Sequence, residues 1–369
     1  MAYNGGVNKA QPETPRMRVR FFDEQRLVNY APLDKANDDA REQLTEAEWS
    51  KVQRFVLSGI NANTKRMYRA HWADFAYFCQ INRLRSLPAR PESIALYLAT
   101  LAEGELKRAT LQARLAAIVK VHDWRFAGAA GYVNPGRDPL VKLSLGAAIR
   151  QRVLEREAVR QVDALSPDDI ATLLDQLDEV YPGDANALKV ACYRALLLIG
   201  FAGGFRRSEL VAVRLRDVRR TTHGLRIILP FSKTDQIGAG MDKFINKSTK
   251  ATGLCPVRAL DSWLAQSNIR SKGPDSFVFP SFGSRGQIRN THLSDRMVAL
   301  LIQNLARRAG FPNWKELGGH SLRAGFITSA LRQGNAEWKV RRQTGHRSSQ
   351  AFRRYIRGQQ DGGDAATVL

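Results

Sequence analysis

The sequence predicts a mainly α-helical protein of two domains, with a small β-hairpin inserted in the second domain. Apolar residues recur every three or four positions over most of the chain, which is typical of helices with one buried face. One strand-like stretch, residues 225–229, interrupts this pattern. With 369 residues, 44% of them hydrophobic, the chain is long enough for two packed domains.

The first domain is predicted to be helical over residues 41–152, after a flexible arm at residues 1–40 that has little periodicity. Three apolar stripes with helical spacing are expected to face one another: Tyr68, Trp72, Phe75 and Cys79; Ile94, Leu98 and Leu101; Leu111, Leu115, Ile118, Val119 and His122. His71 and His122 are predicted to be packed or surface residues. The interleaved basic residues are expected to coat the outside: Lys65, Arg66, Arg69, Lys107, Arg108 and Arg114.

A charge-rich stretch, residues 153–165, is predicted to link the domains, and the second domain covers residues 166–369. It opens with a helix start, in which Ser166 is the N-cap, Pro167 the first helical residue and Asp169 the third residue after the cap. A buried helix is expected at 188–199. Residues 225–229 and 242–245 are predicted to pair across a glycine-containing turn. Further helices are expected near residues 257–266, 294–308, 320–333 and 349–357.

The charge of the chain indicates a polyanionic partner. There are 57 lysines and arginines against 35 acidic residues, a net charge of +22 with a pI near 10.4. Nucleic acid is the usual partner of such a protein, which makes the basic residues of the first domain candidates for DNA contacts. The alternative, that the charge serves solubility alone, is weaker because acidic residues serve that purpose better.

The sequence predicts neither export nor a cofactor. Cys79, Cys192 and Cys255 are far apart and form no disulfide or metal-binding pattern, so they fit buried thiols in a reducing cytoplasm. The N-terminus lacks a signal-peptide pattern, and the longest apolar run, residues 195–205, is too short to span a bilayer. We find no nucleotide-binding loop and no zinc motif, and expect no metal, nucleotide or membrane partner.

Two arginine-containing motifs are candidates for phosphate binding. His320 and Arg323 are three residues apart, so they would share one face of a helix. Arg206 follows the apolar helix directly, and Glu209, one turn later, could hold its guanidinium in place. Arginine suits phosphate because it is planar, always charged and able to donate two parallel hydrogen bonds. Taken alone, the His320 and Arg323 pair fits a solvated helix face better. For Arg206 and Glu209 the alternative is a surface ion pair, and the apolar run before Arg206 argues against it.

The C-terminal region adds a possible nucleophile. Tyr355 stands nine positions after His346 and beside Arg353 and Arg354, in a stretch (336–357) with seven basic residues and one acidic residue. This composition suits an element lying on a phosphate backbone, although a core tyrosine is the ordinary alternative. Lys233, at the tip of the predicted hairpin, could reach a DNA strand and donate a proton, or be an exposed turn lysine.

In this order, the motifs resemble the tyrosine recombinase (phage integrase) family. The resemblance covers roughly residues 166–357, from Arg206 through Lys233, His320, Arg323 and His346 to Tyr355. Residues 82–98 are similar to the helical core-binding domain of Cre-like members. The family implies a C-shaped clamp of two domains around a DNA duplex.

The resemblance also implies a reaction. Tyr355 would attack the scissile phosphate and form a 3′-phosphotyrosine with a free 5′-hydroxyl. Arg206 and Arg323 would bind the non-bridging oxygens, and His320 and His346 would assist them. Such chemistry needs charge neutralisation and acid–base groups but no metal.

In the family pattern Lys233 would protonate the leaving 5′-oxygen and Glu209 would support the site. Four protomers on two double-stranded DNA sites with inverted repeats would exchange strands through a Holliday junction, in the cytoplasm of a bacterial, phage or plasmid system. Two other functions share the basic composition: a non-catalytic DNA-binding protein, which does not need Tyr355, and a topoisomerase that only relaxes DNA.

Overall fold

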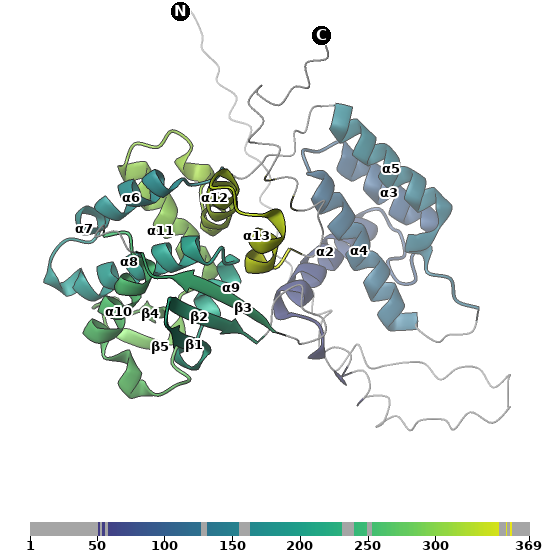
Figure 1. Cartoon of the computed structure of the whole chain (residues 1–369). Helices are drawn as coiled ribbons and strands as arrows, with labels where there is room; N and C mark the ends of the chain where they lie inside the picture. The colour runs from purple at the N-terminus through teal and green to yellow at the C-terminus, as the bar shows by residue number, and fades with distance from the viewer. Residues whose placement is uncertain are drawn as a thin grey trace, which may run out of the picture. The chain divides into compact units, whose positions relative to one another are not determined.

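The computed structural model describes residues 51, 54–55, 58–126, 131–154, 163–230, 240–248, 253–346, 352 and 355. The chain forms two compact units that divide between Val159 and Arg160, inside the range proposed as a linker (Figure 1). The proposed arm at residues 1–40 lies outside the described residues. In both units helices predominate, and the sheets are small and antiparallel.

The first unit consists of helices α2 (Ala62–Ile81), α3 (Pro91–Ala102), α4 (Arg108–Phe126) and α5 (Pro139–Leu154), with a short 3-10 turn, η1, at Pro135–Arg137. The predicted stripes form its core, in which Phe75, Ile94 and Ile118 are fully buried. His122 is buried as well: its Nε2 accepts the Ala89 N–H at 3.0 Å, and its Nδ1 donates to the Ile118 carbonyl at 2.8 Å. Of the two alternatives predicted for this histidine, packed or on the surface, the structure shows the packed one.

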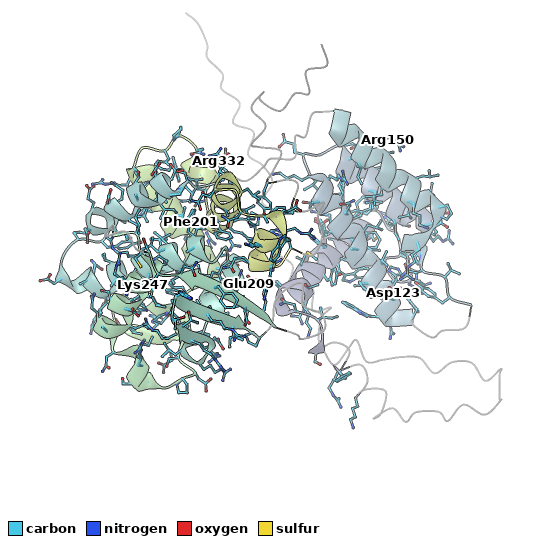
Figure 2. The ribbon with its side chains drawn as sticks, viewed as in Figure 1. Asp123, Arg150, Phe201, Glu209, Lys247 and Arg332 are labelled. Carbon is cyan, nitrogen blue, oxygen red and sulfur yellow. The ribbon has the colours of Figure 1, made fainter. Side chains whose placement is uncertain are left out.

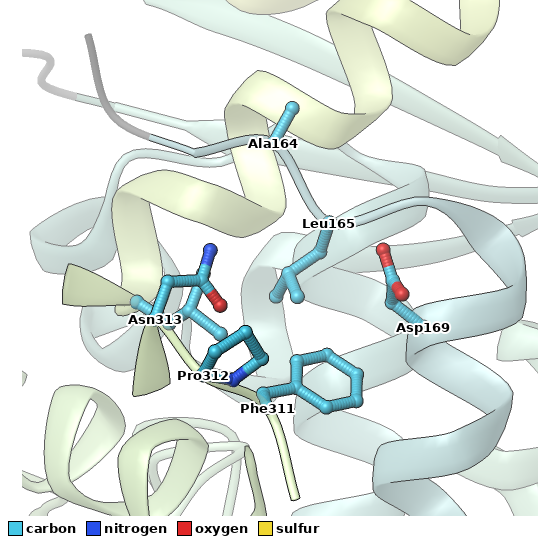
Figure 3. Close-up of a pocket in the computed structure, with 7 residues that line it drawn as sticks. Ala164, Leu165, Asp169, Phe311, Pro312 and Asn313 are labelled. Atoms are coloured by element: carbon cyan, nitrogen blue, oxygen red, sulfur yellow. The ribbon is translucent and has the colours of Figure 1, made fainter. Parts of the chain in front are cut away.

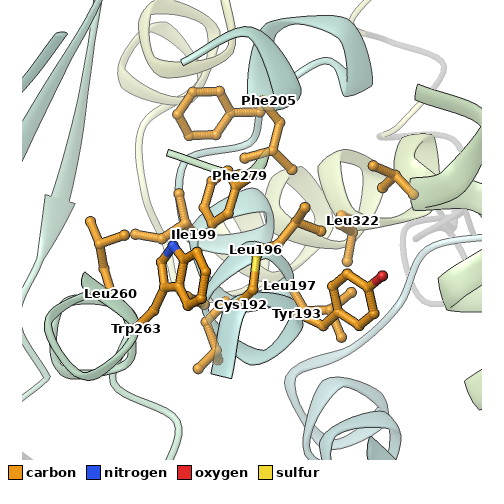
Figure 4. Packing of buried hydrophobic residues seen from close by; sticks show 14 of the residues in the cluster. Cys192, Tyr193, Leu196, Leu197, Ile199, Phe205, Leu260, Trp263, Phe279 and Leu322 are labelled. Carbon is orange, nitrogen blue, oxygen red and sulfur yellow. The ribbon is translucent and has the colours of Figure 1, made fainter. Parts of the chain in front are cut away.

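The second unit is built around the apolar helix α8 (Ala187–Ala202). Figure 4 shows Cys192, Leu196 and Ile199 of this helix packed against Leu260 and Trp263 of α10 (Pro256–Ser267). The remaining helices are α6 (Pro167–Asp175), α7 (Leu177–Val180), α9 (Arg207–Ala212), α11 (Asp295–Arg308), α12 (Gly319–Arg332) and α13 (Glu337–Thr344), with short 3-10 turns between them. The capping box predicted at the start of α6 is present, since Ser166 and Asp169 each bond the other's backbone N–H.

By length and composition the segment Asp184–Ala202 is long and apolar enough to cross a membrane, unlike the shorter run considered in the sequence. Its apolarity has a local explanation, because α8 packs on α10 and α12 inside the hydrophobic core.

The main sheet has the order β1 (Val218–Thr221), β2 (Gly224–Leu229) and β3 (Met241–Asn246). β2 and β3 pair antiparallel, with Leu225 opposite Ile245, which confirms the predicted hairpin. A second sheet pairs β4 (Pro280–Phe282) with β5 (Ile288–His292). β1, β4, β5 and α13 were not predicted. α13 lacks an apolar stripe, since only Val340 and Thr344 are buried in it.

Candidate active site

The structure brings six of the candidate residues together in the second unit: Glu209 and the five residues placed below. Arg206 precedes α9, His320 and Arg323 lie in the first turns of α12, His346 follows α13, and Tyr355 comes after it. Figure 2 labels Glu209 on this side of the unit, near α9, β3 and α13. These elements are distant in the sequence and meet because α12 and α13 pack on each other and α13 packs on β3.

The guanidinium of Arg206 is held by a buried carboxylate and a carbonyl. Its Nη1 donates to Glu209 Oε1 at 2.6 Å, and its Nη2 donates to the Gly345 carbonyl at 3.3 Å. Glu209 also accepts the Arg206 backbone N–H at 3.0 Å. The Glu209 side chain is only 4% exposed, so this contact differs from an ordinary surface ion pair. The fixed geometry leaves further N–H donors of Arg206 for an anion.

Arg323 is almost completely buried, with 1% of its surface exposed. Its Nη1 donates to the Gly204 carbonyl at 3.0 Å, and its Nη2 lies 3.1 Å from Nε2 of His346. Burial lowers the pKa of Arg323 to about 10, so the group stays charged at neutral pH. An arginine held in a partly dry site can neutralise an anion more strongly than one in water.

His346 is neutral in this arrangement. The Thr344 hydroxyl donates to the Val340 carbonyl at 2.7 Å, and its oxygen accepts the Nδ1–H of His346 at 2.8 Å. Nε2 is then free to accept from Arg323. Burial, and then the charge of Arg323, lowers the pKa of His346 to about 3.

Tyr355 and His320 form the pair at which a proton can move. The phenolic oxygen lies 2.9 Å from Nε2 of His320, and the tyrosine ring also packs near His346, with ring centroids 5.5 Å apart. Burial, and then the charge of Arg323, lowers the pKa of His320. The neutral imidazole can therefore accept the phenol proton at neutral pH.

Two glycines shape the backbone of the site. Gly204 has φ +54°, and a Cβ there would lie 2.6 Å from Cδ1 of Phe326. Gly345 has φ +71°, and its Cβ would lie 2.6 Å from Sδ of Met241. Both carbonyls that hold the arginines thus come from left-handed positions that other residues rarely adopt.

Sequence reasoning missed Lys243, a fully buried lysine on β3. Its Nζ contacts the carbonyls of Gly203, Gly204 and Gln343, and lies 3.9 Å from Glu209 Oε2. The available signal was strand alternation, which places Lys243 on the same inward face as Ile245.

Three predicted residues, Lys233, Arg353 and Arg354, lie outside the described residues, and their roles stay predictions. Four of the predicted DNA-contacting residues in the first unit are exposed, and Lys65 is half-buried. The exposed four are Arg66, Arg69, Lys107 and Arg108. Arg114 differs from the expectation of an outer coat, because it pairs with Asp74, bonds the Tyr97 hydroxyl at 2.9 Å and is 16% exposed.

Other parts of the described chain offer no comparable chemistry. A cavity of about 280 Å³ at the start of α6 contains Asp169, which is already engaged in the capping box (Figure 3). Among the described residues, no cluster of three or more His, Cys, Asp or Glu is arranged to hold a metal ion.

Fold and site together define the class of protein: it is a tyrosine recombinase, and therefore an enzyme. Residues 163–361 match the phage integrase family, and the chain belongs to this family. It is 34% identical over 306 residues to the integrase/recombinase xerD homolog of Selenomonas ruminantium, covering 83% of this chain and 84% of that protein. Recombinase cre of Escherichia phage P1 is 22% identical over 338 residues, covering 88% and 91%. The predicted family is confirmed, and the similarity to Cre is the weaker of the two.

The fold is also similar to that of solved recombinases. The lambda integrase dimer bound to a COC′ core site has a TM-score of 0.53 at 16% identity, covering 86% of this chain and 79% of that chain. The XerH recombinase bound to palindromic difH substrate, a post-cleavage complex, has a TM-score of 0.52 at 17% identity, covering 73% and 69%. At such low identity these comparisons show the fold alone.

Proposed function

We propose that this protein is a site-specific DNA recombinase that cuts and rejoins DNA through Tyr355. The observation that carries the proposal is the 2.9 Å contact between the Tyr355 phenol and His320, beside the guanidiniums of Arg206 and Arg323. A nucleophile, a neutral base and two fixed cations are the groups that phosphoryl transfer without a metal needs.

The reaction is a transesterification. Tyr355 Oη attacks phosphorus while its proton passes to His320 Nε2. Arg206 and Arg323 neutralise the charge on the non-bridging oxygens. The bond from phosphorus to the 5′-oxygen breaks, and that oxygen takes a proton, in our proposal from Lys233. The product is a 3′-phosphotyrosine diester, which conserves the energy of the original bond, so no nucleotide is consumed. Attack by a 5′-hydroxyl of a second strand reverses the step.

DNA is the proposed substrate because of charge and family. The relatives named above are recombinases, and two of the similar structures hold DNA sites. In the first unit, the exposed basic residues Arg66 and Arg69 of α2 and Arg108 of α4 provide a phosphate-binding surface. We propose that both units contact a duplex, and that four protomers on two inverted-repeat sites exchange strands through a Holliday junction.

The proposal is tested by trapping the covalent adduct. The protein is incubated with sheared DNA of its source organism, denatured in detergent, and the DNA that stays attached is sequenced. The wild type and Tyr181→Phe, a control at a half-buried tyrosine that packs against Tyr193, should yield adducts at a discrete sequence. Tyr355→Phe should yield none while it still binds DNA. If the wild type binds DNA and leaves no adduct, the protein is a non-catalytic DNA-binding protein. If adducts form but two recovered sites never recombine, it is a topoisomerase.

A further inference from the structure

Lys243 is buried in a way that lysines rarely are. Its side chain is 0% exposed, and its Nζ lies 2.8 Å from the Gln343 carbonyl, 3.1 Å from that of Gly203 and 3.4 Å from that of Gly204. Lysine is almost never fully buried unless it is paired. The nearest carboxylate, Glu209, is 3.9 Å away and balances the charge.

The bonding of Lys243 excludes the role of proton donor to DNA. An ammonium group has three N–H donors, and three carbonyl oxygens occupy them. A proton donor to the leaving oxygen must have an N–H directed at that oxygen. The ammonium of Lys243 is instead directed at the protein backbone beneath the site.

Two of the partners of Lys243, the Gly204 carbonyl and Glu209, also hold the proposed phosphate-binding arginines. The Gly204 carbonyl accepts from Arg323 Nη1 at 3.0 Å. Glu209 accepts from Arg206 Nη1 at 2.6 Å. Lys243 therefore contacts both groups that hold the guanidiniums. These are the Gly204 carbonyl, which accepts from Arg323, and the Glu209 carboxylate, which accepts from Arg206.

Another partner of Lys243, the carbonyl of Gln343, connects strand β3 to the segment that leads to His346. The Gln343 side chain makes two hydrogen bonds to the backbone of Phe244, the residue after Lys243 in β3. It accepts the Phe244 N–H at 3.2 Å and donates to the Phe244 carbonyl at 2.8 Å. Two residues beyond Gln343, the Gly345 carbonyl accepts from Arg206, and His346 follows. The Lys243 bond to the Gln343 carbonyl thus fixes the end of α13 against β3.

We propose that Lys243 is a positioning residue for cleavage, which sets the relative placement of the Arg206 and Arg323 guanidiniums by holding the 203–206 loop, Glu209 and the end of α13. This inference rests on the proposed function, since it concerns the same phosphoryl transfer. The ammonium is the form that does this, because a neutral amine has only two N–H donors for three carbonyls.

The electrostatics of Lys243 indicate that the residue positions the arginines and does not mainly stabilise the fold. Burial lowers the pKa of Lys243 to about 7, against the opposing effect of Glu209. A charge kept in such a place is costly, and a well-packed apolar residue of similar volume is often neutral or favourable for stability. Lys243→Met should therefore fold, while the arginines lose their common support.

The test compares binding with chemistry on one DNA, the duplex recovered from the trapped adducts. Affinity and the single-turnover rate of adduct formation at saturating DNA are measured for the wild type, Lys243→Met, Lys243→Arg and Lys247→Met. Lys247, the matched control, is exposed beyond the end of β3 and lies away from Glu209 in Figure 2. We expect Lys243→Met to lower the rate about 100-fold with little change in affinity, because small misplacements of binding groups have effects of this size. Lys243→Arg, which keeps a cation with several donors, should restore part of the rate, and Lys247→Met should match the wild type.

The outcomes are distinguishable. Absence of adduct with the wild type overturns the proposed function. A wild-type adduct together with an unchanged rate in Lys243→Met overturns the positioning role alone, as does a loss of affinity equal to the loss of rate. If Lys243→Met does not fold, NMR of the wild type labelled with ¹⁵N-lysine tests whether the Lys243 ammonium is held by the backbone carbonyls. One ammonium signal should exchange slowly with solvent, and its absence overturns the proposal.

Discussion

The phenolic oxygen of Tyr355 lies 2.9 Å from Nε2 of His320, a residue 35 positions earlier in the chain. The contact joins the proposed nucleophile to the proposed base, whose pKa is lowered by burial and by Arg323. The imidazole of His320 therefore stays neutral, and able to accept a proton, at pH values near 6.5 at which a free histidine is already partly protonated.

The acid side of the pH–rate profile should report His320. Since its pKa lies below the ordinary value of 6.5, the cleavage rate should fall as the pH drops through that lowered pKa, where the imidazole takes up a proton. His320→Gln cannot take up a proton and should lower the rate by about 100-fold or more. Single-turnover adduct formation between about pH 5 and 8 measures both effects. An unchanged acid limb in His320→Gln would show that another group controls it.

Arg206→Lys should lower the cleavage rate by about 100-fold to 1,000-fold while most DNA affinity remains. Lysine retains the charge but cannot keep the two fixed contacts to Glu209 and Gly345 and still present a planar pair of donors. Arg219→Lys, the same change on the exposed strand β1, is the control. Cleavage at the wild-type rate in Arg206→Lys would mean that the phosphate lies elsewhere.

Gly204→Ala should destabilise the second unit by about 1–3 kcal/mol more than Gly183→Ala. Both glycines have positive φ, but a Cβ at Gly183 meets nothing within 4 Å, whereas one at Gly204 would lie 2.6 Å from Phe326 Cδ1. Comparing the two variants therefore separates the cost of a left-handed backbone, which both share, from the cost of the steric clash with Phe326, which only Gly204→Ala has. Chemical denaturation of the full chain measures the difference, and equal losses would contradict the close packing of the loop.

DNA binding should distinguish two arginines of the first unit. Arg66→Ala should lower the slope of log affinity against log salt by about 1, as expected for one lost phosphate contact. Arg114→Ala should leave that slope nearly unchanged and instead reduce the free energy of unfolding by about 1 kcal/mol, because Arg114 is engaged with Asp74 and Tyr97. Titrations at several salt concentrations decide, and equal slopes for both variants would contradict the assignment.

Local patterns predicted much of the fold. The apolar run of α8, the alternation in β2 and the capping box of α6 each depend on residues close in sequence. The helix α13 was not predicted because it buries so little apolar surface that its sequence shows no apolar periodicity. Its position against β3 is fixed by tertiary contacts that no local pattern contains.

The candidate site divides in the same way. The pairing of Arg206 with Glu209 follows from their spacing of three residues. The burial of Lys243 depends on a strand register, in which Lys243 lies opposite Ile227, and on a carbonyl 100 positions away. The engagement of Arg114 depends on Asp74, 40 positions earlier on another helix. Contacts over such separations are set by the folded structure.

The most direct measurement is mass spectrometry of the trapped adduct after digestion with nuclease and protease. The peptide that contains Tyr355 should carry a nucleotide joined through its 3′-phosphate, and no other peptide should carry one. A nucleotide attached to a different residue, or an adduct that forms equally well in Tyr355→Phe, would contradict the assignment of the nucleophile.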